Sequence, residues 1–66
     1  NESIANIYDV TGKLIKTENI SKGNNSIVLN ANPGYYIVKL INGNTVKSQK
    51  IITTIELQTV TVHCTY

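Results

Sequence analysis

The stretch GYYIVKLI, from Gly34 to Ile41, decides the fold of this chain. Successive side chains of a strand point to opposite faces, and this run is apolar in both phases until Lys39 interrupts one of them. Strands that are covered on both faces have this composition, so the run predicts a central strand over residues 35–41. Tyr36, Val38 and Leu40 share the phase that we expect to face the core.

Shorter strand-like runs lie on both sides of this central stretch. Asn42-Gly43-Asn44 favours a tight hairpin, which returns as a strand over residues 46–52. Upstream, residues 3–8 and 13–17 flank the sequence Asp-Val-Thr-Gly at positions 9–12, which has the residues that a type I turn prefers at its two ends. These two runs therefore predict a hairpin.

The remaining segments are less regular. Residues 26–30 predict a strand that ends at Asn32-Pro33-Gly34, where proline removes a backbone donor. Residues 18–25 are polar, so we expect a loop from which Ile20 covers one end of the core. The tail, residues 54–66, changes its apolar phase by one residue, which predicts a bulge or bend near Gln58-Thr59. Short strands with turns between them predict a sandwich or small barrel without a helix longer than a turn.

Composition limits the chain to one small domain. A chain of 66 residues buries about 60% of the surface that its unfolded form exposes, and a core of that size supplies no more than about 3–5 kcal/mol. Cys64 is the single cysteine, so no internal disulfide can add to this stability. Because the chain contains no methionine and begins at Asn1, we expect it to be a segment of a longer protein.

The positive charge of the chain does not indicate a nucleic-acid partner. The net charge is +2, and six lysines spread from Lys13 to Lys50 carry all of the positive side-chain charge. Nucleic-acid binders cluster Lys and Arg, whereas scattered lysines are typical of solvated strand faces and protected edges. No apolar run approaches the ~20 residues of a membrane-spanning helix, so we expect neither nucleic-acid binding nor membrane insertion.

No set of residues predicts catalysis, and we expect a protein that is not an enzyme. His63 and Cys64 are the one pair of base and nucleophile types, but neighbours on a strand point to opposite faces. We interpret Cys64 as a half-buried thiol or as one free to form an intermolecular disulfide. Asp9 is a turn former, and no other carboxylate has a partner at a spacing suited to acid–base chemistry or metal binding. We therefore expect no cofactor and no metal.

Four motifs follow one another along the chain. Ile7 to Ile15 matches the hairpin pattern i-Y-D-x-x-G-k-x-v, and Ile27-Val28-Leu29 matches an i-x-L strand. Gly34 to Leu40 matches G-x-Y-x-v-k-i, and Lys50-Ile51-Ile52 matches a closing k-i-v strand. In order and spacing, over residues 4–53, they resemble the type A C-terminal sorting domain of the type IX secretion system of Bacteroidetes.

The resemblance implies a small immunoglobulin-like antiparallel β-sandwich of about five or six short strands. The family opens with a Y-P-N-P segment and a further strand, so this chain resembles an N-terminally truncated member. The family usually stops near the k-i-v strand, which implies a sorting-domain-like sandwich over residues 1–53 and an extra strand-like tail over residues 54–66. That tail could take the place of the missing strand or be an unrelated extension.

The resemblance also implies a function. Such a domain directs an exported cargo protein, fused upstream, through an outer-membrane translocon, and a sortase-like peptidase then removes the domain. The expected location is secreted or at the cell surface, reached through the periplasm. One alternative is an immunoglobulin-like accessory module that binds carbohydrate or acts as an adhesive spacer. Another is a truncated structural fragment whose free strand edges would favour a strand-swapped homodimer.

A translocon that exports unrelated cargoes needs one folded domain that all of them share. It would recognise this domain by shape and backbone, for example through strand pairing at a sheet edge. We expect the recognition surface at the first turn, at the proline corner and at the closing strand. The candidate residues are Asp9, Gly12, Pro33, Gly34, Tyr35, Lys50, Ile51 and Ile52.

Overall fold

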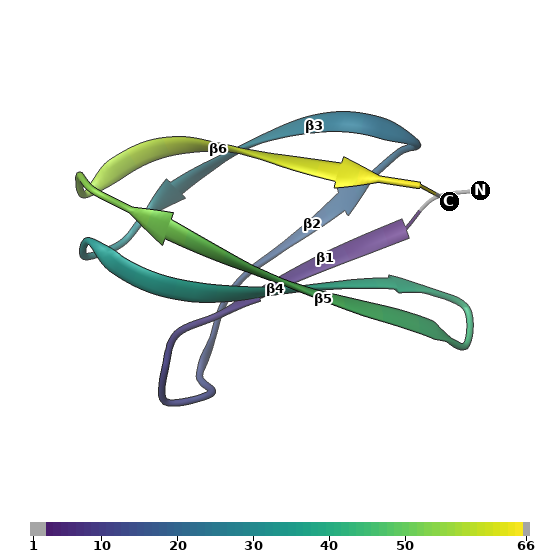
Figure 1. Ribbon diagram of the computed structural model, residues 1–66, viewed down its shortest axis with the longest axis horizontal. Coiled ribbons are helices and arrows are strands. Elements are labelled where there is room, and N and C mark those ends of the chain that lie inside the picture. Colours follow the sequence, from purple (N-terminus) through teal and green to yellow (C-terminus); the bar gives the residue numbers. More distant parts are fainter. Residues whose placement is uncertain (1–2, 66) are drawn as a thin grey trace.

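The structure, a computed structural model that describes residues 3–65, consists of six antiparallel strands in two packed sheets (Figure 1). The strands are β1 (Ser3–Tyr8), β2 (Leu14–Ile20), β3 (Gly23–Asn30), β4 (Gly34–Asn42), β5 (Thr45–Thr53) and β6 (Leu57–Cys64). Residues 3–65 contain no helix. The predicted all-β sandwich of about five or six strands is therefore confirmed.

β4 is a central strand of the larger sheet, whose order is β2-β1-β4-β5. It pairs with β1 on one side and with β5 on the other, where the ladder runs from Gly34 opposite Thr53 to Asn42 opposite Thr45. A two-residue turn, Gly43-Asn44, joins β4 to β5. The central strand and the tight hairpin that the sequence predicts are both confirmed.

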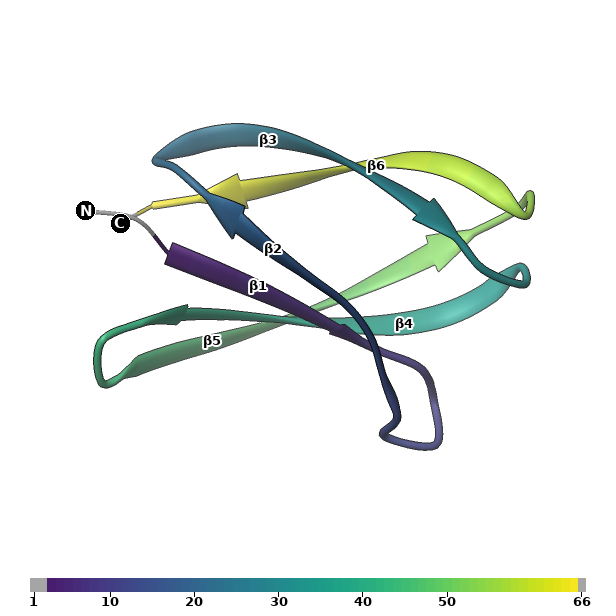
Figure 2. The same ribbon diagram turned by 180° about the vertical axis from the view of Figure 1, so that it is seen from behind.

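β3 and β6 form the smaller sheet, which lies over one face of the larger sheet (Figures 1 and 2). Their ladder runs without a register shift from Gly23 opposite Cys64 to Asn30 opposite Leu57. β3 follows β2 after two residues, and β6 follows β5 after three. Each strand of the smaller sheet is therefore joined by a short connection to an edge strand of the larger sheet.

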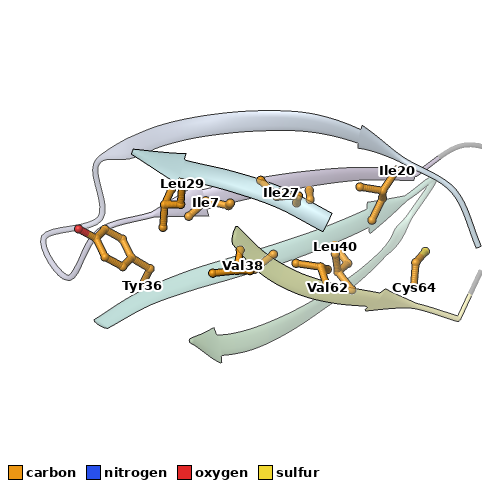
Figure 3. Close-up of a cluster of buried hydrophobic side chains, with 11 residues drawn as sticks. Ile7, Ile20, Ile27, Leu29, Tyr36, Val38, Leu40, Val62 and Cys64 are labelled. Atoms are coloured by element: carbon orange, nitrogen blue, oxygen red, sulfur yellow. The ribbon is translucent and has the colours of Figure 1, made fainter. Parts of the chain in front are cut away.

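The core lies between the two sheets (Figure 3). β4 contributes Tyr36, Val38 and Leu40, which occupy the inner phase that the alternation in the sequence predicts. Ile51 of β5 packs against the cluster from a partly buried position. The buried apolar residues are Ala5, Ile7, Ile20, Ile27, Leu29, Tyr36, Val38, Leu40, Val60, Val62 and Cys64.

The predicted loop over residues 18–25 is wrong, because most of that segment belongs to two strands. Glu18 lies opposite Ala5 in the ladder between β2 and β1, and Asn25 lies opposite Val62 in the ladder between β3 and β6. β2 and β3 are edge strands, and polar residues are tolerated there because one edge is open to water. The buried position of Ile20 is as expected.

The predicted bulge near Gln58-Thr59 is also wrong, because β6 keeps one register along its whole length. The change of phase falls in residues 54–56, between β5 and β6. There the backbone N–H of Thr54 donates to Gln58 Oε1 at 2.8 Å, and the N–H of Ala31 donates to the Glu56 carbonyl at 2.9 Å. A connection outside the ladders can change phase without breaking any strand pairing.

Candidate recognition surface

Residues 3–65 form no pocket, and no group of three or more His, Cys, Asp or Glu side chains in this range could hold a metal ion. The described part of the chain also has no helix long and apolar enough to cross a membrane. His63 and Cys64 point to opposite faces of β6: His63 Nδ1 lies 2.9 Å from Asn24 Oδ1 at the surface, whereas Cys64 is 1% exposed. The exposed faces of the two sheets are therefore the candidate functional surfaces.

The outer face of the larger sheet gathers exposed apolar side chains. The ladders bring Ile4 next to Ile41, Ile41 next to Val46, and Tyr35 next to Ile52. Five of the nine large apolar side chains exposed in the described chain lie on this face, between 40% and 57% exposed. We call these five the outer-face patch: Ile4, Leu14, Tyr35, Val46 and Ile52. Exposed apolar residues that gather on one face are typical of an interaction surface.

Two lysines lie over aromatic rings on the same face. Lys50 Nζ is 4.7 Å from the centre of the Tyr35 ring, and Lys39 Nζ is 5.2 Å from the centre of the Tyr8 ring. Ammonium groups at these distances are attracted by the negative face of the ring. Each lysine therefore places a positive charge directly over a tyrosine ring of the outer face.

The turn from Asp9 to Gly12, at one end of the larger sheet, is held by one carboxylate oxygen. Asp9 Oδ1 accepts hydrogen bonds from the Thr11 N–H at 2.9 Å, the Thr11 hydroxyl at 2.6 Å and the Lys13 N–H at 3.0 Å. The Thr11 hydroxyl, and after it the Lys13 N–H, lower the pKa of Asp9 because they stabilise the ionised carboxylate. The Gly12 N–H donates to the Asp9 carbonyl at 3.0 Å, and its φ of +89° favours glycine.

The corner that leads into β4, which we call the Asn32–Tyr35 corner, is anchored on two sides. The hydroxyl of Tyr36, whose ring lies in the core, donates to the carbonyl of Asn32. The N–H of Gly34 donates to Oγ1 of the buried Thr53 at 3.1 Å. Both the turn and the corner are thus fixed in shape by contacts within the domain.

The structure brings part of the predicted surface together. Tyr35, Lys50 and Ile52 share the outer face of the larger sheet. The Asp9–Gly12 turn and the Asn32–Tyr35 corner, which contains Pro33 and Gly34, lie at the same end of the sandwich (Figures 1 and 2). Ile51 lies opposite Tyr36 and packs against the core, so it does not share the outer face.

Sequence reasoning missed Ile4, Leu14 and Val46, which also belong to the outer-face patch. In β1 and β5 the alternation places Ile4 and Val46 in the phase opposite to the core residues. Leu14 reaches this face through a register shift between Ile7 and Tyr8 in the ladder of β1 with β2. The first two positions could have been found from alternation alone, whereas the third depends on the shift.

In residues 3–65 these features define a small all-β module that presents a face rather than a cavity. The family model described as "Secretion system C-terminal sorting domain" matches residues 1–56, and the chain belongs to this family. It is a C-terminal sorting domain of the type IX secretion system, which directs an attached cargo protein into secretion and to the cell surface, and it is not an enzyme. No curated protein and no solved structure matches the chain.

Proposed function

We propose that the secretion translocon of the outer membrane recognises this domain through the outer face of the larger sheet and the two anchored corners at its end. The proposal rests on one observation: exposed apolar side chains and two lysines that lie over tyrosine rings gather on that one face. A partner that covers the face removes apolar area from water, which stabilises the complex by roughly 25 cal/mol per Å².

The anchored corners support recognition by shape. The Asp9–Gly12 turn and the Asn32–Tyr35 corner are each held by hydrogen bonds inside the domain. A surface that is already ordered loses little conformational entropy when a partner binds it. The same shape is presented whatever cargo is attached, which is what a translocon for many cargoes requires.

The edge of β5 offers a second mode of recognition. β5 is an edge strand of the larger sheet, and its outer edge, which pairs with no other strand of residues 3–65, adjoins the outer-face patch through Val46 and Ile52. An extended segment that pairs with such an edge gains backbone hydrogen bonds whatever its own side chains. We propose that the partner lies on the outer face and along this edge together.

The other partners follow from the sorting role. We propose that the cargo is fused upstream and that a sortase-like peptidase at the cell surface removes the domain. Because the family is not catalytic, the peptidase supplies the nucleophile for the cleavage. A second copy of the chain is a further partner that we propose, joined by exchange of β6.

Binding of carbohydrate has less support in the side-chain geometry. Sugars stack on open aromatic rings, but lysine ammonium groups lie over the rings of Tyr8 and Tyr35. Residues 3–65 also form no pocket that could enclose a sugar ring. The accessory-module function therefore ranks behind sorting.

The sorting role and its surface are tested in one secretion assay. The chain is fused behind a signal peptide and a fluorescent reporter and produced in a bacterium that has the type IX machinery. Wild type is compared with Tyr35→Ser, Ile52→Ser and Val28→Ser. The last is the matched control, because Val28 is 50% exposed, Tyr35 51% and Ile52 57%, but Val28 lies on the smaller sheet.

We expect wild type and Val28→Ser to carry the reporter out of the cell, and the two variants of the outer face to leave it in the periplasm. If the wild-type chain leaves the reporter in the periplasm, this segment does not suffice for sorting. If wild type is exported and all three variants are exported equally well, the domain is recognised elsewhere and the proposed surface is wrong. Thermal melts of the purified variants check that all of them are folded.

A further inference from the structure

The lysines of the outer face have no carboxylate beside them in residues 3–65. Lys39 and Lys50 each lie over a tyrosine ring, and no ion pair joins either ammonium group to an acidic side chain of these residues. Asp9 holds the first turn, Glu18 lies in the inner phase of β2 beside a lysine of its own strand, and Glu56 lies in the connection between β5 and β6. Within residues 3–65 the outer face is therefore apolar and positively charged.

The two lysines are near neighbours across the ladder of β4 with β5. Lys39 lies opposite Ser48, and Lys50 follows Ser48 by two residues on the same face. Diagonal neighbours of this kind are about 7–8 Å apart. Two like charges at this distance repel each other, so a negative group that comes to this part of the face is attracted by both.

The residues of β5 that face outward also direct their backbone groups to the outer edge. Asn42 lies opposite Thr45 on either side of the two-residue turn, where the flanking residues exchange backbone hydrogen bonds. This bonding alternates along an antiparallel ladder, so every second residue from Thr45 onward bonds to β4. The N–H and C=O groups of the residues between them point to the outer edge, which pairs with no other strand of residues 3–65. These residues are Val46, Ser48, Lys50 and Ile52.

This edge determines which class of anion suits the lysines best. A phosphate or a lipid headgroup would contact the ammonium groups and leave the backbone groups of the edge to water. An extended protein segment contacts both, because it pairs with the edge and places one side chain directly opposite Lys50. Opposite residues that exchange hydrogen bonds have Cα atoms about 5.5 Å apart, so a glutamate or aspartate there reaches the ammonium group. The edge and the charge together favour an acidic peptide segment.

We propose that the translocon segment that pairs with β5 has an acidic side chain opposite Lys50. It runs antiparallel to β5, as all paired strands of residues 3–65 do. Its outward side chains are then β-branched or aromatic opposite Ile52 and Val46, and serine or threonine opposite Ser48. Cross-strand pairs of these kinds stabilise sheets. This inference rests on the function proposed above, and it adds the chemistry by which the edge selects its partner.

The edge of a second copy does not meet this requirement. β5 has two lysines and no carboxylate, so two such edges would bring lysines together without an acid. The segment that comes nearest in residues 3–65 has Asp9 with Ile7 two residues before it and Thr11 two residues after it, but Lys13 stands where the second apolar residue belongs. The selection of an acid therefore also protects the edge against pairing with itself.

The first test compares charge variants in the reporter assay. Wild type is compared with Lys50→Glu, Lys50→Gln and Lys50→Arg. Lys22→Glu is the matched control, because Lys22 is exposed but lies in the connection between β2 and β3. We expect Lys50→Arg and Lys22→Glu to be exported like wild type, Lys50→Gln to be exported less, and Lys50→Glu to remain in the periplasm. Thermal melts check that each variant is folded.

The outcomes separate this inference from the proposed function. If Lys50→Glu is exported like wild type while Ile52→Ser is not, the outer face is recognised but its partner is not an acidic segment. If both are exported like wild type, the proposed surface is wrong, and this inference is wrong with it.

A second test does not depend on the secretion machinery. The probe is a synthetic peptide of seven residues, with valine at both ends, glutamate third, serine fifth and threonine elsewhere. A control peptide has lysine in place of the glutamate. Each is titrated into ¹⁵N-labelled wild type and Lys50→Glu, and the amide signals of β5 are followed by NMR. We expect wild type to bind the glutamate peptide about fivefold more tightly than the control peptide, and Lys50→Glu to reverse this order.

The same order in both proteins, or no shift of the β5 amides with either peptide, overturns the proposal. Vesicles of phosphatidylglycerol test the lipid alternative. We expect wild type to stay in solution when these vesicles are sedimented. Sedimentation of wild type with the vesicles that is lost in Lys50→Glu would assign the lysines to a lipid surface and would also overturn the proposal.

Discussion

Tyr36 offers the sharpest test of the packing, because its ring and its hydroxyl perform separate tasks. The ring is 6% exposed and lies in the core, and the hydroxyl donates to the carbonyl of Asn32 at the start of the corner. Tyr36→Phe removes the hydrogen bond alone, which costs about 1 kcal/mol of unfolding free energy. Tyr36→Ala also removes the buried ring, for a loss of about 3–5 kcal/mol.

These losses are large for a chain of this size. At about 0.05–0.15 kcal/mol per residue, 66 residues give a total stability of roughly 3–10 kcal/mol. Tyr36→Ala therefore unfolds the domain or leaves it marginal, whereas Tyr36→Phe lowers the melting temperature by about 4–8 °C. Tyr35→Ala is the matched control, because Tyr35 is the neighbouring tyrosine of β4 and is 51% exposed. We expect this control to cost less than about 1 kcal/mol.

The assay is urea unfolding of the four proteins, followed by circular dichroism and by tyrosine fluorescence. The order of midpoints should be wild type, then Tyr35→Ala and Tyr36→Phe, with Tyr36→Ala far below. If Tyr36→Ala unfolds at the same urea concentration as Tyr35→Ala, the ring does not lie in the core, and the inner phase assigned to β4 is wrong. If Tyr36→Phe matches wild type, the hydrogen bond to Asn32 contributes nothing to the corner.

Three further predictions concern the corner, the smaller sheet and the first turn. Gly34 has a φ of +152° and open space where a Cβ would stand, so Gly34→Ala should cost about 1 kcal/mol or more through backbone strain alone, and an unchanged urea midpoint would contradict this. Val62→Ala should cost about 2 kcal/mol because Val62 is fully buried, whereas Thr61→Ala on the outer face should stay within about 0.5 kcal/mol; equal costs would show that β6 does not cover the core. Because the folded-state pKa of Asp9 is lowered from its ordinary 3.8, its contribution to stability is present above that pH and is lost as the pH falls through the folded-state value. Wild type should therefore be more stable than Asp9→Asn at pH 7, with a gap that closes below about pH 4; a gap that is the same at pH 2 and pH 7 would refute the role of the carboxylate.

The contacts between neighbouring strands were predictable from the sequence because a short turn fixes them. A two-residue turn at Gly43-Asn44 sets Asn42 opposite Thr45, and counting back along both strands sets Tyr35 opposite Ile52. Alternation then assigns the faces. In this way the centre of the candidate surface follows from local rules.

The pairing of distant strands was not predictable in the same way. Alternation shows that Val60 and Val62 share a face, but it does not show that β6 lies beside β3, because no short turn joins the two strands. Ile4 meets Ile41 through another such long-range pairing. Polar edge strands add a second difficulty, because residues 18–25 have the composition of a loop, and most of them belong to two strands only through their partners in the ladders.

The lysines of the outer face affect both the tendency of the free domain to self-associate and its choice of partner. A small all-β domain with free edges and an exposed apolar face is at risk of self-association. Lys39 and Lys50 lie over the rings of Tyr8 and Tyr35, so a surface that covers these two rings also comes close to two ammonium groups. A purely apolar partner would bury these charges without acceptors, at a cost that opposes the gain from covering Tyr35 and Ile52. We therefore expect the partner of this face to bring hydrogen-bond acceptors or carboxylates to the lysines.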